Sequence, residues 1–205
     1  PDLSRTPAQL PALPSASLDA AALGRAYGPS RSRVLTGSAA SESVFKRAAA
    51  SYRVLHLATH GVLDSTQPLS SFLWLTPDGQ AGEDGRLEAR EIMELDLRAD
   101  LTVLAACDTA RGTVSSGEGL VGMSWALLIA GSPTTVASQW KVDALSTSAL
   151  MREFHRAWLA AGRRPATARP HRAEALRQAA LALAHQTRWS HPFYWAPFVM
   201  LGDGY

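Results

Sequence analysis

The chain contains one cysteine, Cys107, which directly follows the mostly apolar run 101–106 and precedes polar and glycine residues. A short run of this composition is typical of a parallel strand that is buried on both faces. The carboxyl end of such a strand opens onto the crevice in which α/β proteins bind ligands. Cys107 is therefore a candidate nucleophile, although a lone cysteine is more commonly a small buried hydrophobic residue.

A second stretch, residues 52–61, has the same organisation and ends on His60 and Gly61. If the two strands are neighbours in a parallel sheet, their carboxyl ends bring the imidazole of His60 next to the thiol of Cys107. A histidine in that position can accept the proton of the thiol or, as imidazolium, lower its pKa. Gly61 lacks a Cβ atom, so a substrate can approach its backbone closely. We expect the N–H groups of Gly61 and Cys107 to form an oxyanion hole.

The spacing and order of these residues resemble a known family. His60 precedes Cys107 by about 50 residues, as in the caspase-type cysteine proteases. The chain is similar to the CHAT branch of that clan in six motifs, at residues 56–61, 84–92, 106–109, 117–122, 137–140 and 191–198. The resemblance implies a caspase-like three-layer α/β sandwich, with a mostly parallel central sheet flanked by helices. It further implies a cysteine endopeptidase with a Cys–His dyad, joined in a bacterial protein to N-terminal helical repeats.

The composition predicts one domain. A chain of 205 residues with 46% hydrophobic residues can bury a sizeable core. We expect residues 18–205 to form this domain, and the Pro-, Ala- and Leu-rich residues 1–17 to form a linker or strap.

A single cysteine excludes an internal disulfide and suits a reducing, cytoplasmic setting. The sequence contains no recognisable signal peptide or membrane span, and its longest apolar helix candidate, 120–130, is expected to be a buried core helix. Trp125, within that helix, is expected in the core or at its edge.

The sequence argues against a metal site, a bound nucleotide or any other cofactor. His56 and His60 are four residues apart, but on an extended strand this spacing separates them by roughly 13 Å, too far to share one ion. His56 is therefore expected to pack in the interior or to support His60. Residues 112–117 imitate a phosphate-binding loop, but Glu118 follows where a lysine is required and would repel phosphates.

The charge distribution does not favour nucleic acid as a partner. The formal net charge is only +2. The basic residues gather mainly in the segment 163–172, which contains two prolines and no aromatic side chain. Nucleic-acid binding usually combines a basic face with aromatic residues that stack on bases. We therefore expect this segment to be a solvated loop between two helices.

The hydrophobic periodicity predicts alternating strands and helices, as in parallel crossover units. Strands are expected over residues 33–36, 52–60, 71–76, 101–106, 134–138 and 198–201. Helices are expected over residues 18–27, 41–50, 87–95, 120–130, 144–161 and 172–186.

The residues after the strand 134–138 are expected to bind a protein or peptide substrate. The backbone from Ser138 to Lys141 would pair with an extended substrate by strand addition. Trp140 would form a wall of the site or belong to the core. Asp108 and Asp143 favour a basic residue before the scissile bond, whereas Lys141 favours an acidic one, and two carboxylates against one ammonium favour Arg or Lys. The alternative function is a caspase-like interaction module of a repeat-containing scaffold, whose dyad is present but idle.

Overall fold

The computed structural model describes residues 10, 12–64, 66–80, 82–105, 107–108, 118–162 and 171–204, with the backbone alone for Cys107, Asp108 and Glu118. Three expectations fall wholly or mainly outside these residues. They concern most of the strap 1–17, the stretch 112–117, and residues 163–170 of the basic segment.

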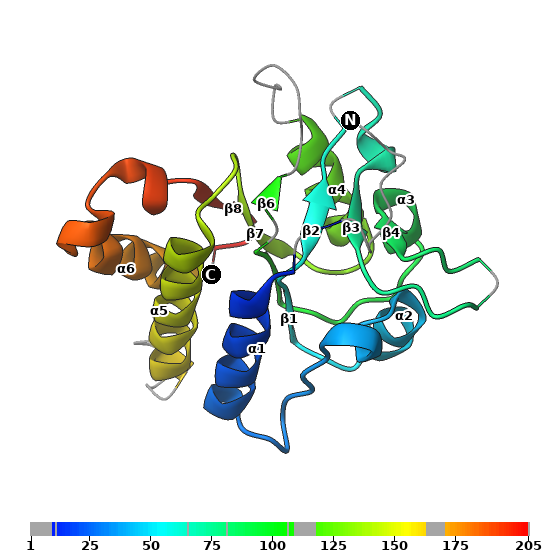
Figure 1. Cartoon of the computed structure of the whole chain (residues 1–205), viewed down its shortest axis with the longest axis horizontal. Coiled ribbons are helices and arrows are strands. Elements are labelled where there is room, and N and C mark those ends of the chain that lie inside the picture. The colour runs from blue at the N-terminus through cyan, green and yellow to red at the C-terminus, as the bar shows by residue number, and fades with distance from the viewer. Residues whose placement is uncertain are drawn as a thin grey trace.

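A four-stranded sheet forms the centre of the molecule (Figure 1). Its strands, in spatial order, are β1 (Val54–Leu57), β5 (Leu101–Leu104), β7 (Thr134–Ser138) and β8 (Phe198–Gly202). The first three are parallel, and β8 is antiparallel to β7. The carboxyl ends of β1, β5 and β7 therefore lie at one edge of the sheet. This agrees with the expectation that two strand ends bring His60 next to Cys107.

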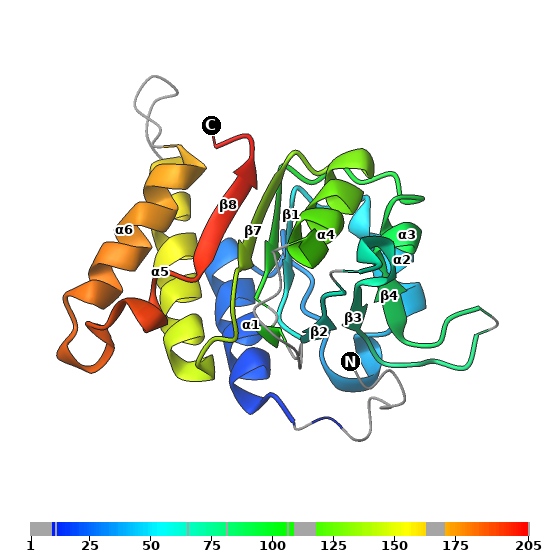
Figure 2. The ribbon, with the colours of Figure 1, turned by 90° about the horizontal axis from the view of Figure 1, so that it is seen from above.

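Helices cover both faces of this sheet, which makes three layers (Figure 2). One layer contains α1 (Pro14–Tyr27), α5 (Ala144–Gly162) and α6 (Arg172–Ala184); the other contains α2 (Glu42–Ala49), α3 (Ala89–Ile92) and α4 (Glu118–Ile129). Side chains alternate across the strands, so that Leu55 and Leu57 pack with the second layer, whereas Leu101 and Val103 pack with the first. The expected α/β fold, with a mostly parallel central sheet flanked by helices, is confirmed.

A second, smaller sheet continues from the carboxyl ends of two central strands. Its strands, in spatial order, are β4 (Arg86–Glu88), β3 (Phe72–Trp74), β2 (His60–Val62) and β6 (Cys107–Asp108). β2 follows β1 in the chain and β6 follows β5, and these two strands remain parallel neighbours. The other pairs are antiparallel. Four short 3-10 helices complete the described elements, at Gly37–Ala39, Pro68–Ser70, Thr187–Trp189 and Pro192–Tyr194.

Several expected elements differ from the structure. The helix expected over residues 87–95 begins only at Ala89, because Leu87 and Glu88 belong to β4 and pair with β3. The strand expected over residues 33–36 is absent, since these residues pair with no strand in the described chain. α1 begins at Pro14, inside the expected strap, because proline at the first position of a helix needs no N–H partner.

The helix expected over residues 120–130 is present as α4, but it is not buried all round. Its inner face packs against the sheet through Leu120, Met123 and Leu127. Trp125 is 58% exposed, which contradicts its expected place in the core, and the outer face also exposes Val121, Leu128 and Ile129. Neither α4 nor any other helix in the described ranges is long and apolar enough to cross a membrane.

Candidate active site

His60 and Cys107 lie opposite each other on the neighbouring parallel strands β2 and β6. Their Cα atoms are register partners, as are those of Gly61 and Asp108. Neighbouring strands are about 5 Å apart, so the backbones of the two residues are within reach of a direct side-chain interaction. The juxtaposition expected from the sequence is therefore present in the backbone, while the chemical roles of the residues stay predictions.

Short connections hold His60 in this position. β1 ends at Leu57, and the chain passes through Ala58 and Thr59 before β2 begins at His60. The hydroxyl of Thr59 donates a hydrogen bond to the backbone carbonyl of Trp74, which ties the start of β2 to the end of β3. The imidazole of His60 is half-buried, and Gly61 is buried. The histidine thus lies at the start of β2 in the smaller sheet, two residues beyond the end of β1.

The segment that carries Cys107 is held by β1 until just before the cysteine. The N–H of Ala105 donates to the carbonyl of Leu57 over 2.9 Å, which extends the β1–β5 pairing beyond the end of β5. The chain then pairs with β2 instead, through Cys107 and Asp108. The pairs β1–β5 and β2–β6 therefore fix the backbones of His60 and Cys107 side by side.

A chain of three polar side chains lies behind the site, at the interface of β1, α1 and α5. The Nδ1 atom of His56 is 3.1 Å from Nε2 of His155, and the Nδ1 atom of His155 is 2.8 Å from the hydroxyl of Tyr27. His155 is only 1% exposed. Burial lowers the pKa of His56 to about 4, and burial together with the nearby His56 lowers the pKa of His155 to about 3. Both imidazoles are therefore neutral at pH 7, and the half-buried His56 packs against the buried His155, in agreement with the first of its two expected roles.

The sequence does not indicate that His56 and His155 contact each other. His155 lies within the helix expected over residues 144–161, but nothing local to it indicates that it contacts His56 or Tyr27. The contacts join residues 99 and 128 positions apart in the chain. A polar residue on the apolar face of a helix is the one signal that a buried partner exists, because a buried polar group requires a hydrogen bond.

The residues expected to bind substrate follow the carboxyl end of β7. Ser138 pairs with Phe198 of β8, and the N–H of Gln139 donates to the carbonyl of Pro197 over 2.9 Å. β8 therefore occupies one edge of this segment, while on the other edge the pairing of β7 with β5 ends at Ala137. Trp140 is 37% exposed, which places its ring at the surface and not in the core.

Asp143 has a structural role at the start of α5. Its carboxylate accepts a hydrogen bond of 2.9 Å from the N–H of Ser146, and its carbonyl accepts one of 3.1 Å from the Ser146 hydroxyl. Asp143 thereby caps the amino end of α5, a position that aspartate commonly takes. The sequence does indicate a capping role, because Asp143 immediately precedes the expected helix 144–161. The described contacts do not join Asp143 or Trp140 to His60.

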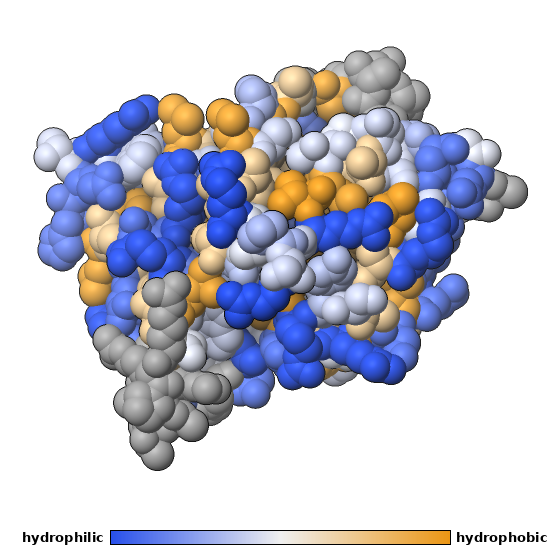
Figure 3. Space-filling view, turned by 90° about the horizontal axis from the view of Figure 1, so that it is seen from below, coloured by the Kyte–Doolittle hydropathy of each residue, from blue (hydrophilic) through white to orange (hydrophobic). Residues whose placement is uncertain are grey.

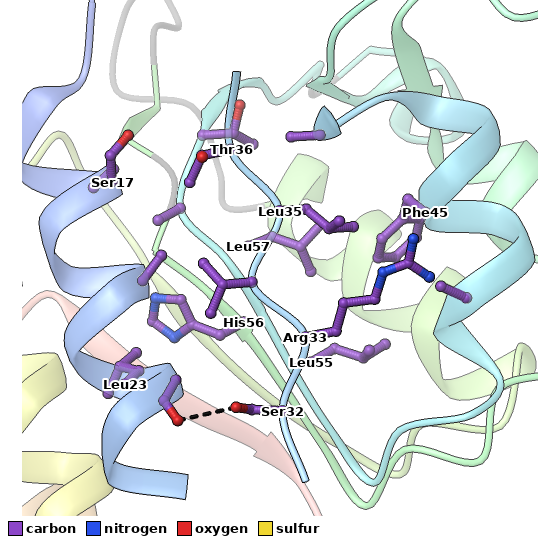
Figure 4. Close-up of a pocket in the computed structure, with 18 of the residues that line it drawn as sticks. Ser17, Leu23, Ser32, Arg33, Leu35, Thr36, Phe45, Leu55, His56 and Leu57 are labelled. Carbon is purple, nitrogen blue, oxygen red and sulfur yellow. Dashed lines mark hydrogen bonds between the residues drawn. The ribbon is translucent and has the colours of Figure 1, made fainter. Parts of the chain in front are cut away.

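A large cavity connects the site with the histidine pair. Its volume is about 1120 Å³, and His60, His56, His155 and Tyr27 all contribute to its lining. Figure 4 shows His56 between β1 and α1, and Leu57 beside Leu35 of the segment that joins α1 to α2. Figure 3 shows the molecule from the side of that segment, with apolar surface near the middle of the face and hydrophilic side chains around it.

Comparison with known proteins assigns this arrangement to a family. A family model of the CHAT domain matches residues 1–203. The chain belongs to the CHAT domain family. A similar curated protein, tetratricopeptide repeat protein 28 of Mus musculus, is 27% identical to this CHAT domain over 117 residues. These residues are 57% of the present chain but 4% of that protein, so the chain spans a small fraction of the length of this relative.

Proposed function

We propose that this CHAT domain is a cysteine endopeptidase that cleaves protein substrates through a dyad of Cys107 and His60. The observation that carries the proposal is the register of β2 and β6, in which the two residues are partners on adjacent parallel strands. Membership of the CHAT domain family supports it, because the resemblance to caspase-type proteases implies the same two residues as a catalytic dyad.

The proposed reaction is acyl transfer in two steps. His60 accepts the proton of the Cys107 thiol, and the thiolate attacks the carbonyl carbon of the scissile peptide. The N–H groups of Gly61 and Cys107 stabilise the negative charge on the carbonyl oxygen. The imidazolium of His60 then donates its proton to the leaving amine, which leaves an acyl-enzyme. Water, activated by His60, hydrolyses this thioester and releases the thiolate.

The experiment that tests this function compares the natural full-length protein with its Cys107→Ala variant in a cell lysate. New protein N-termini, identified by mass spectrometry, are expected with the wild type and not with the variant. A His185→Ala variant serves as a control, because His185 is exposed at the end of α6, away from the site. Identical sets of N-termini from the wild type and Cys107→Ala, under every activating condition tried, would rule out the peptidase.

The alternative function is an interaction module of a repeat-containing scaffold with an idle dyad. The observation in its favour is the similarity to a protein that is named for its tetratricopeptide repeats. The lysate experiment separates the two functions, since a scaffold leaves the N-termini unchanged. In either case we propose that the domain acts in a longer, cytoplasmic protein whose N-terminal helical repeats bring in a partner or a signal, and that neither function involves nucleic acid or a membrane.

We further propose that the peptidase prefers Arg or Lys before the scissile bond, because Asp108 ends β6 beside Cys107 and Asp143 follows β7. The structure adds a condition to the test of this preference. Replacing Asp143 by Ala also removes the cap of α5, which costs about 1 kcal/mol of stability. Asn at this position retains the capping oxygen and removes the charge.

An Asp143→Asn enzyme is therefore expected to lose its preference for basic over neutral residues by about tenfold, with unchanged stability. The measurement is a profile over a peptide library, with the melting temperature recorded for each variant. An unchanged preference for Arg, or a preference for Asp or Glu in the wild type, would show that Asp143 does not select the substrate.

A further inference from the structure

The chain passes from the main sheet to the smaller sheet immediately before His60. β1 ends at Leu57, the backbone bends at Thr59, and β2 begins at His60. Figure 1 shows β2 continuing from β1 and lying beside β3. A bend at this point sets the direction in which the next side chain leaves the backbone. The orientation of the proposed base therefore depends on how firmly the bend is held.

Thr59 is held at this bend by its own side chain. Its hydroxyl donates a hydrogen bond to the backbone carbonyl of Trp74, the last residue of β3. The register of β2 and β3 pairs Gly61 with Leu73. Continued by one residue, this register brings His60 level with Trp74. The hydroxyl thus adds a side-chain hydrogen bond at the end of the β2–β3 pairing, where His60 enters the strand.

The residue that accepts this hydrogen bond is itself fixed. Trp74 is buried, and its ring packs edge-to-face on Phe72 with the ring centroids 5.0 Å apart. The guanidinium of Arg86 lies 5.1 Å from the centroid of the Trp74 ring. Just beyond it, the N–H of Leu75 donates to the carbonyl of Gly85 over 2.8 Å, so the end of β3 stays joined to the chain before β4. A side chain that is bonded to such a fixed group is restrained in turn.

The partner of His60 in the proposed dyad lies on the side of β2 that faces away from β3. The Cα atoms of His60 and Cys107 are register partners on β2 and β6. Proton exchange between the two side chains requires a hydrogen-bonding distance. A misplacement of about 1 Å costs about 10²-fold in rate, so a small movement at the bend is expected to have a large effect on catalysis.

We propose that Thr59 is a positioning residue whose hydroxyl, through its hydrogen bond to Trp74, sets the direction from which the imidazole of His60 meets Cys107. The inference rests on the proposed function, since it takes His60 as the base of the dyad. The role belongs to the hydroxyl and not to the size of the side chain. Serine at position 59 therefore retains it, whereas valine, which is similar in shape to threonine, leaves the Trp74 carbonyl without this donor.

The kinetic test compares Thr59→Val and Thr59→Ser in the natural full-length protein, on a substrate taken from the lysate experiment. Thr59→Val is expected to lower kcat by about 10- to 100-fold and to change KM by less than about twofold, because substrate binding does not depend on the orientation of the base. Thr59→Ser is expected to restore kcat to within about threefold of the wild type. An unchanged kcat in Thr59→Val, or an equal loss in both variants, would overturn the proposal.

Alkylation of Cys107 by iodoacetamide gives a second readout that requires no cleavage. Its rate at neutral pH follows the thiolate, and it is expected to fall by about fivefold in Thr59→Val, towards the rate of His60→Ala. In a His60→Ala background, Thr59→Val is expected to cause no further change, because a positioning residue acts only through the group that it positions. A hydroxyl that only stabilises the fold would slow the labelling equally with and without His60, and that result would contradict the proposal.

Thr134→Val is the matched control, because it removes the same kind of hydrogen bond at the opposite edge of the main sheet. The hydroxyl of Thr134, at the amino end of β7, donates to the carbonyl of Asp203. This variant is expected to have a lower melting temperature but to label Cys107 at the wild-type rate. If Thr59→Val does not fold, Thr59→Ala removes the hydroxyl with less bulk, and the same comparison decides.

The labelling experiment also separates a failure of this proposal from a failure of the proposed function. Equal labelling of Cys107 in the wild type and in His60→Ala would contradict the dyad, and the positioning role with it. Labelling that depends on His60 but is the same in the wild type and in Thr59→Val would overturn the positioning role alone.

Discussion

Substitution of either member of the proposed dyad is expected to lower kcat/KM by about 10⁴-fold or more, and substitution of both is expected to lower it no further. The physical reason is that the two groups act as one unit. Without His60 the thiol of Cys107 stays protonated at neutral pH, and without Cys107 the histidine has no nucleophile to activate. Residual activity then reflects substrate binding and the oxyanion hole alone.

The measurement is a double-mutant cycle of Cys107→Ala, His60→Ala and the combined variant, on a substrate taken from the lysate experiment. Alkylation by iodoacetamide provides an independent readout, because the rate of Cys107 labelling at neutral pH reports its thiolate and should fall in His60→Ala. Additive losses in the cycle, or equal labelling of Cys107 in the wild type and in His60→Ala, would show that the two residues are not coupled. His185→Ala is expected to match the wild type in both measurements.

The parts of the fold that the sequence predicted best are those with a strong local pattern. β5 is a short, mostly apolar run, as a parallel strand buried on both faces requires, and β7 is likewise buried along its whole length. His60 follows β1, and Cys107 follows β5. Because parallel strands share the direction of their carboxyl ends, local patterns were enough to predict that these two residues meet.

The parts that were missed depend on contacts between distant segments. Leu87 and Glu88 have helical neighbours in sequence, yet their pairing with β3 decides that they are extended. Trp125 lies in a helix that is apolar all round, and such a pattern does not tell which face the sheet covers. The residues 33–36 have the composition of a strand, but Ser32 and Val34 hold this segment on α1 instead of on β1.

At the site, too, local patterns were predicted and contacts between distant segments were missed. The sequence pattern selected His60, Gly61 and Cys107 because each ends or follows an apolar run. It did not reveal that Asp143 caps α5, although Asp143 immediately precedes the expected helix 144–161, because a carboxylate beside the site is equally typical of a substrate contact. The contact of His56 with His155 joins a strand to a helix across the sheet face, and no local periodicity encodes such a pair.

The buried histidine pair is expected to make the domain sensitive to acid. Burial lowers the pKa of both groups in the folded state, to about 4 for His56 and about 3 for His155, from about 6.5 in the unfolded chain. Between these values the unfolded state binds more protons than the folded state. The stability is therefore fully present above pH 6.5 and is lost as the pH falls towards 4, by up to about 1.4 kcal/mol per pH unit for each histidine.

Urea unfolding at pH 7.5, 6 and 5 measures this slope directly. Other buried groups act in the opposite direction, since burial raises the pKa values of Glu42 and Asp19 and so favours the folded state at low pH. The comparison of variants removes their contribution. A His155→Gln variant retains a hydrogen-bonding side chain between Tyr27 and His56 but does not titrate, and it is expected to show a shallower loss of stability between pH 7.5 and 5.

His185→Gln is the matched control, because the same substitution at this exposed position should leave the slope unchanged. The His155→Gln variant starts from a lower stability at pH 7.5, since an optimal contact with Tyr27 and His56 is lost, and the decisive quantity is therefore the slope and not the midpoint at one pH. Equal slopes for the wild type and His155→Gln would mean that His155 does not remain neutral in the folded protein. In that case His155 would gain its proton over the same pH range in the folded and the unfolded protein, and the conclusion that burial lowers its pKa would be wrong.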